Sequence, residues 1–247
     1  MFGVGFVEAM RAPFQDSDWL RKFVLGGLLS LVPNLAMALL IAEQVPWVLG
    51  PVLFIFGLVL SWVVWGYLYR IFVDALNGQA WHTLPEWVNW KVYSSAGLRV
   101  FLIVLGYILL TGVGLTGLLS ILGMFPSGKN PEQLSAVVLL VMLAVMLLYG
   151  FLPIAFARFA AEGRVWAAFD PWALWADIRA LVKGDYVQTC LAFYGLWLMG
   201  NLVLGWLPYV GLPLVSTYSF YVMVVFARLF GRMIGVEGQK ALSSEDR

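Results

Sequence analysis

The chain alternates between long apolar segments and short polar connections. A helix needs roughly 20 apolar residues to cross the hydrocarbon core of a membrane, which is about 30 Å thick. Segments of this length and uniformity predict helices, because the strands of a membrane barrel are shorter and alternate in polarity. The sequence contains six such segments: Phe23–Ala42, Trp47–Val73, Leu98–Phe125, Ala136–Phe159, Val187–Leu207 and Val210–Phe230. The pattern therefore predicts an all-α integral membrane protein with six transmembrane helices.

The polar connections repeat a pattern of glycine and tryptophan. A glycine followed by three tryptophans occurs twice at one constant offset, as Gly78, Trp81, Trp87 and Trp90 and again as Gly163, Trp166, Trp172 and Trp175. A fainter copy, Pro13-Phe14 followed by Asp18-Trp19, lies before the first apolar segment. An arginine also closes every second apolar segment: Arg70, Arg158 and Arg228.

These repeats predict three tandem hairpin units within one membrane domain. The domain covers residues 1–235, its units cover about 1–78, 79–163 and 164–235, and a polar cytoplasmic tail follows at 236–247. Each unit holds two spans, so the three copies share one orientation and can be related by an axis along the membrane normal. The alternative is that any pair of spans with aromatic residues at its ends looks repetitive.

Two of the connections have amphipathic character. In Pro171–Lys183, Leu174 and Ile178 fall on one helical face, which predicts a helix lying in the headgroup plane. Pro85–Ser95 is a weaker version of the same pattern. Asp16 or Ser17 is the expected N-cap of the first long helix. The expected stop signals are Gly78, Gly163 and Gly184.

Composition and charge exclude several classes of protein. Hydrophobic residues make up 62% of the chain and charged residues only 12%, which is too few to cover a soluble domain of 247 residues. The net charge of +1 argues against a nucleic-acid partner. One cysteine and one histidine, Cys190 and His82, predict no metal site, no haem and no other cofactor.

The distribution of positive charge predicts the orientation. Of the 15 Lys and Arg residues, all except Lys129 fall on one side of the six predicted spans. The positive-inside rule therefore places both termini in the cytoplasm, in a multi-pass protein of the cytoplasmic membrane. Arg70, Arg158 and Arg228 are expected to be topology anchors whose side chains reach the lipid headgroups.

The remaining polar and aromatic residues favour structural roles. Asn34 and Asn201 are expected to make interhelical hydrogen bonds, with a ligand contact as the alternative. Trp87, Trp90, Trp172 and Trp175 are expected in the aromatic belts at the membrane boundary. Glycines that permit close helix approach are expected at Gly112, Gly114 and Gly117, whereas the GxxxG pair Gly231 and Gly235 is expected outside the core.

The chain resembles a known family, the bacterial and archaeal membrane proteins called domain of unknown function 4013. The resemblance covers roughly residues 7–235 and implies a multi-pass membrane protein. Because the family has no assigned activity, it transfers no functional residues. The matching elements are Pro13-Phe14, Asp18-Trp19-Leu20 with Lys22, Gly26-Gly27, Gly66-Tyr67-Leu68-Tyr69-Arg70, Leu84-Pro85-Glu86-Trp87, Leu152-Pro153, Ala157-Arg158-Phe159, Gly163, Ala168-Phe169 and Gly184-Asp185-Tyr186.

The sequence contains none of the common catalytic motifs, which favours a protein that is not an enzyme. The leading hypothesis is a scaffold, assembly or accessory subunit that contacts membrane lipids and partner subunits of a larger membrane complex. A second hypothesis is transport or handling of a lipid or another small apolar molecule. A third, an intramembrane enzyme, would use Asp170, Asp177 and Asp185, which more simply cap and solvate an interfacial helix.

Overall fold

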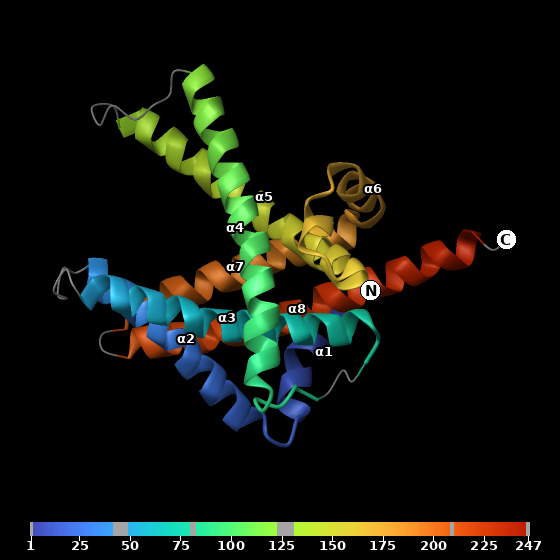
Figure 1. Cartoon of the computed structure of the whole chain (residues 1–247), viewed down its shortest axis with the longest axis horizontal. Coiled ribbons are helices and arrows are strands. Elements are labelled where there is room, and N and C mark those ends of the chain that lie inside the picture. Colours follow the sequence, from blue (N-terminus) through green and yellow to red (C-terminus); the bar gives the residue numbers. More distant parts are fainter. Residues whose placement is uncertain (1, 42–48, 80–82, 123–130, 208–209, 246–247) are drawn as a thin grey trace.

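The computed structural model describes residues 2–41, 49–79, 83–122, 131–207 and 210–245, and its regular structure over these ranges is entirely helical (Figure 1). Six helices are long and apolar enough to cross a membrane, which confirms the six predicted segments. These are α2 (Trp19–Ile41), α3 (Leu49–Leu76), α4 (Trp90–Ile121), α5 (Pro131–Glu162), α7 (Gly184–Gly205) and α8 (Gly211–Glu245). The shorter elements are α1 (Phe2–Arg11), α6 (Pro171–Leu181) and two 3₁₀ turns, η1 (Ala12–Gln15) and η2 (Val165–Phe169).

The connections differ from each other in structure. The prediction of a helix over Pro171–Lys183 is confirmed by α6, whose first turn is capped by Asp170. The prediction of a helix over Pro85–Ser95 is wrong for residues 85–89, which are not helical, because α4 begins only at Trp90 and covers the rest of the segment. The carbonyls of Leu84, Pro85 and Glu86 accept hydrogen bonds from side chains of other segments, which holds this stretch outside a helix.

Helix α8 lies at the centre of the molecule and packs against α2, α3 and α7. Half of its most apolar stretch is buried, more than in any of the other candidate spans. One core cluster joins α8 to α2 and α3 through Tyr67 and Phe220, and another joins it to α5 and α7 through Ile154 and Phe193. The buried interior of the protein is thus organised around its last helix.

Glycines bring α3 into backbone contact with two neighbours. A Cβ on Gly66 of α3 would collide with the carbonyl of Tyr93 in α4. In α8, a Cβ on Gly231 or Gly235 would collide with the backbone of α3. The GxxxG pair therefore lies in a tight interface between α3 and α8, whereas its expected place outside the hydrocarbon core of the membrane stays a prediction.

The outer parts of α4 and α5 project away from the other helices (Figure 1). The glycines expected to permit close packing there, Gly112, Gly114 and Gly117, have no neighbouring atom within 4 Å of an added Cβ. Large apolar side chains on this arm are exposed, with Val113 75% and Ile121 84% accessible. Within the described residues, no other helix covers this surface.

Candidate functional site

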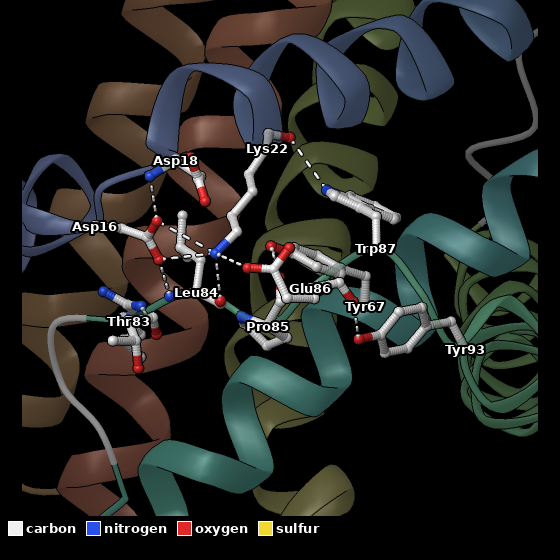
Figure 2. A network of polar contacts seen from close by, with 11 residues as sticks. Asp16, Asp18, Lys22, Tyr67, Thr83, Leu84, Pro85, Glu86, Trp87 and Tyr93 are labelled. Atoms are coloured by element: carbon white, nitrogen blue, oxygen red, sulfur yellow. Dashed lines mark hydrogen bonds and ion pairs between the residues drawn. The ribbon is translucent and has the colours of Figure 1, made fainter.

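The buried ammonium group of Lys22 is the centre of a polar network (Figure 2). Lys22 lies in the first turns of α2 and is only 5% exposed. Its Nζ lies 3.0 Å from Asp16 Oδ2 and 2.6 Å from Glu86 Oε1, and it donates a hydrogen bond of 2.9 Å to the carbonyl of Leu84. These contacts join the N-terminal segment to the connection between α3 and α4, far apart in the sequence.

Asp16 completes the network. It was an expected N-cap of the first long helix, but α2 begins only at Trp19, three residues later. Its carboxylate accepts hydrogen bonds from the backbone N–H groups of Leu84 (2.6 Å) and Asp18 (2.8 Å), as well as from Lys22. Burial raises the pKa of Asp16, but the Leu84 and Lys22 hydrogen bonds outweigh burial and leave this pKa below its usual value. The carboxylate is therefore charged at neutral pH and neutralises a buried lysine.

Trp87, at the end of the same connection, contacts both α2 and α3. Its indole N–H donates to the carbonyl of Lys22 at 3.2 Å, and its ring stacks on Tyr67 with centroids 3.8 Å apart. The Tyr67 hydroxyl donates to the carbonyl of Pro85, and the Tyr93 hydroxyl donates to that of Glu86. The connection over residues 83–87 is thus fixed by side chains from α2, α3 and α4.

Arg228 of α8 also binds this connection. Its Nη2 donates to the carbonyl of Thr83 at 2.7 Å, and the residue is only 2% exposed. Its Nη1 is buried without a hydrogen-bond partner among the described residues. The expectation that Arg228 reaches the lipid headgroups is therefore wrong, because this side chain is inside the protein.

The other two closing arginines have different partners. Arg70 is about half exposed and pairs with Asp74 one turn later in α3, at 3.0 Å. Arg158 of α5 pairs with Asp177 of α6 at 2.5 Å and with Glu162 at 3.5 Å. Arg158 thus ties α6 to α5, whereas Arg70 makes a contact within one helix.

The four tryptophans singled out from the sequence do not lie in equivalent places. Trp87 is 8% exposed and Trp90, beside it, is 40% exposed. Trp172 is 84% exposed, and Trp175 is 51% exposed with the guanidinium of Arg179 4.8 Å from its ring centre. The remaining residues of the first copy, Trp81 and His82, and the charge on Lys129 lie outside the described residues.

The two asparagines make hydrogen bonds between helices. Asn34 of α2 donates to Ser216 of α8 at 3.0 Å. Asn201 of α7 donates to Ser219 of α8 at 3.4 Å and to the carbonyl of Trp197 at 2.6 Å. Both side chains thus connect a neighbouring helix to the central α8.

A second candidate site is an apolar cavity of about 100 Å³ between α3, α4, α5, α7 and α8. Its walls are mainly aromatic and contain almost no polar surface. Among the described residues, no three His, Cys, Asp or Glu side chains are grouped so that they could hold a metal ion. The arrangement can therefore accommodate an apolar molecule.

The sequence did not reveal either site. In the sequence, Lys22 contributes to the one-sided positive charge and to the family resemblance, and neither feature indicates that it is buried. The Leu84-Pro85-Glu86-Trp87 element pointed to the right segment, but its partners come from the segment before α2 and from α2, α3 and α4. The cavity had no sequence signature, because its walls come from five helices.

Comparison with known proteins gives a family and no activity. Residues 49–209 match the family model described as a protein of unknown function, DUF4013. Comparisons with curated proteins and with solved structures gave no match. The family match runs from the first residue of α3 to just beyond α7, more than half of the chain. The chain therefore belongs to the DUF4013 family.

Proposed function

We propose that this DUF4013 protein crosses the bacterial cytoplasmic membrane six times, with both termini in the cytoplasm, and acts by contact as a scaffold, assembly or accessory subunit. Six helices of sufficient length and hydropathy support the six crossings. The one-sided distribution of Lys and Arg supports the orientation. The hairpins α2–α3, α4–α5 and α7–α8 would form three tandem units, which the matching glycine–tryptophan pattern supports.

The orientation is tested by labelling single cysteines in intact cells. Cys190 is first replaced by Ala, and one cysteine is then introduced as Ser127→Cys or Ser244→Cys. A membrane-impermeant thiol reagent is expected to label the cysteine at position 127 in intact cells and the one at position 244 only after the cells are opened. Labelling of both from the same side would contradict the proposed topology.

The observation that carries the contact role is the uncovered arm formed by the outer parts of α4 and α5. Val113 and Gly117 lie one turn apart on α4, where Val113 is 75% exposed and Gly117 has nothing within 4 Å of an added Cβ. Small residues let another helix approach closely in a membrane, where packing drives association. This surface is suited to a helix of a partner subunit.

A photocrosslinking amino acid at position 113 tests the contact role in native membranes. The expected product is one protein adduct of defined mass, which Gly117→Leu abolishes because its side chain occupies the contact. Gly195→Leu is the matched control, since Gly195 of α7 is equally open. If position 113 yields only lipid adducts, the arm faces the bilayer and the contact role is refuted.

The apolar cavity favours a second candidate function, handling of a lipid or another small apolar molecule. A membrane protein that binds such a molecule needs no buried charge at the site, and the cavity walls are apolar. Purified protein in liposomes is expected to speed the movement of a fluorescent lipid between leaflets, measured by quenching with dithionite. Movement no faster than in protein-free liposomes would remove this candidate.

A further inference from the structure

The cavity between α3, α4, α5, α7 and α8 is lined by Tyr69 and Tyr149, the two tyrosines of the described residues whose hydroxyl groups make no hydrogen bond. Its aromatic walls include Trp65, Tyr69, Tyr149, Phe156, Phe193 and Phe226. At about 100 Å³ it is much larger than the space that holds one water molecule. Walls of this kind favour an extended apolar group over water.

The other tyrosine hydroxyl groups of the described residues are paired with the backbone. Of the tyrosines in the described residues, seven donate a hydrogen bond to a carbonyl oxygen: Tyr67, Tyr93, Tyr107, Tyr186, Tyr194, Tyr218 and Tyr221. No such bond is made by Tyr69 or Tyr149, and both line the cavity. A ligand with acceptor oxygens at this place would give these two hydroxyl groups hydrogen-bond partners.

A positive charge lies near one of these two hydroxyl groups. The guanidinium of Arg99 interacts electrostatically with Tyr69, and its side chain is exposed. The next residue in α4, Val100, lines the cavity. The cavity thus combines apolar walls with two lining tyrosines whose hydroxyl groups have no partner among the described residues, and the charge of Arg99 acts on one of them. This combination matches a hydrocarbon chain that ends in an oxygen-bearing, negatively charged head.

We propose that the cavity binds a fatty acyl chain, whose carbonyl or carboxylate oxygens accept hydrogen bonds from Tyr69 and Tyr149. The acyl group comes from a free fatty acid or from a membrane phospholipid, since both present the same chain and oxygen. The proposal rests on the second candidate function and names its ligand class. Binding is measured without transport, so a protein that binds acyl chains but does not move them refutes only that function.

The test is equilibrium binding of the fluorescent fatty acid cis-parinaric acid. The protein is purified in a detergent with a steroid body, because detergents with alkyl chains would compete for the cavity. Saturable binding of one molecule per chain is expected, with displacement by oleic acid. A titration without saturation, or with many equivalent sites, would overturn the proposal.

Variants locate the bound chain. Ala227→Phe places a ring into the cavity that Ala227 lines and is expected to lower affinity at least tenfold. The double change Tyr69→Phe and Tyr149→Phe removes the two hydroxyl groups, keeps the aromatic rings of the cavity wall and is expected to weaken binding about tenfold. This second variant tests the site even if Ala227→Phe does not fold. Leu191→Phe, at an exposed position of α7, is the control and is expected to bind normally. Normal binding by both cavity variants would refute the site.

The source of the acyl chain is settled by the head group. Parinaric acid and a phosphatidylcholine carrying a parinaroyl chain are titrated against the protein and against Arg99→Gln. Stronger binding of the free acid, lost in Arg99→Gln, identifies a fatty-acid site. Equal or stronger binding of the phospholipid, unaffected by Arg99→Gln, identifies a lipid-chain site. Binding of neither compound contradicts the proposal.

Discussion

The connection between α3 and α4 and the connection between α5 and α6 carry the same glycine–tryptophan pattern but different structures. Gly78 and Gly163 have nearly the same backbone conformation, with φ of 70° and 69°, and each follows the end of a long helix. The matching tryptophans nevertheless differ, since Trp87 is 8% exposed and Trp172 is 84% exposed. The shared glycines serve the turn, because a left-handed conformation favours a residue without Cβ.

The partners of each connection explain the difference. The first is held from outside its own hairpin, by Lys22 of α2 and Arg228 of α8. The second is held by Tyr107 of α4. The Tyr107 ring stacks on Phe169 of η2 with ring centroids 5.1 Å apart, and its hydroxyl donates to the carbonyl of Ala168. Repeated residues in a sequence therefore identify similar turns. The burial of each turn depends instead on the side chains of other helices that pack against it.

The largest expected effect comes from removing the buried lysine. Lys22→Met keeps the length of the side chain but leaves Asp16, which is 6% exposed, without its cation. An unpaired buried charge costs about 3–5 kcal/mol, so the free energy of unfolding should fall by that amount. Thermal unfolding in detergent measures the loss. Lys91→Met, at an exposed position at the start of α4, is the matched control and should change little.

The two tryptophans of the repeat give the next test. Trp87→Ala removes a buried ring stacked on Tyr67 and should cost about 3 kcal/mol of stability. Trp172→Ala removes an exposed ring, and its effect should stay within about 0.5 kcal/mol. The same unfolding measurement applies to both variants. Equal losses would mean that the two connections are buried alike in the membrane, and the comparison would fail.

The sequence predicts the helices well because hydropathy is a local property. All six apolar segments correspond to long helices, and Asp170 was recognisable as a cap since its partners are the next few residues. Burial of Lys22 and Arg228 was not predictable in this way. Their partners, Leu84 and Thr83, are remote in sequence, and a cation at a helix end looks like a topology anchor until the connection that covers it is known.

The glycines show the same limit. Gly112, Gly114 and Gly117 are concentrated in one predicted span, yet the structure leaves them open, while Gly231 and Gly235 contact α3. Spacing along one helix indicates which residues share a face, and the second helix decides whether that face is used. The tandem arrangement of three hairpins stays a prediction for the same reason, because similar turns do not require similar packing.

A smaller effect is expected from the ion pair of the second connection. Asp177→Asn weakens the pair with Arg158, whose side chains are 26% and 31% exposed. Partly exposed pairs contribute about 0–1 kcal/mol, so stability should fall by no more than that. A double-mutant cycle with Arg158→Gln isolates the pair. A coupling energy as large as the loss of unfolding free energy in Lys22→Met would mean that this pair stabilises the protein as much as the buried network does, and the comparison would fail.

The smallest effect at working pH is expected from titrating Asp16. Its pKa in the folded protein lies below its usual value, so its contribution to stability is fully present above about pH 4 and is lost as the pH falls through the lowered pKa. Unfolding temperatures of the wild type and of Asp16→Asn, measured from pH 7 to pH 3, separate this contribution from that of other carboxylates. The variant should be less stable at neutral pH, and the difference should shrink only at the acid end. A difference that grows as the pH falls from 7 to 5 would show that the pKa of Asp16 is raised in the folded protein, so that the carboxyl group is protonated there. The buried lysine would then keep only the partly exposed Glu86 as its counter-charge, and the first connection would be held less firmly than the network implies.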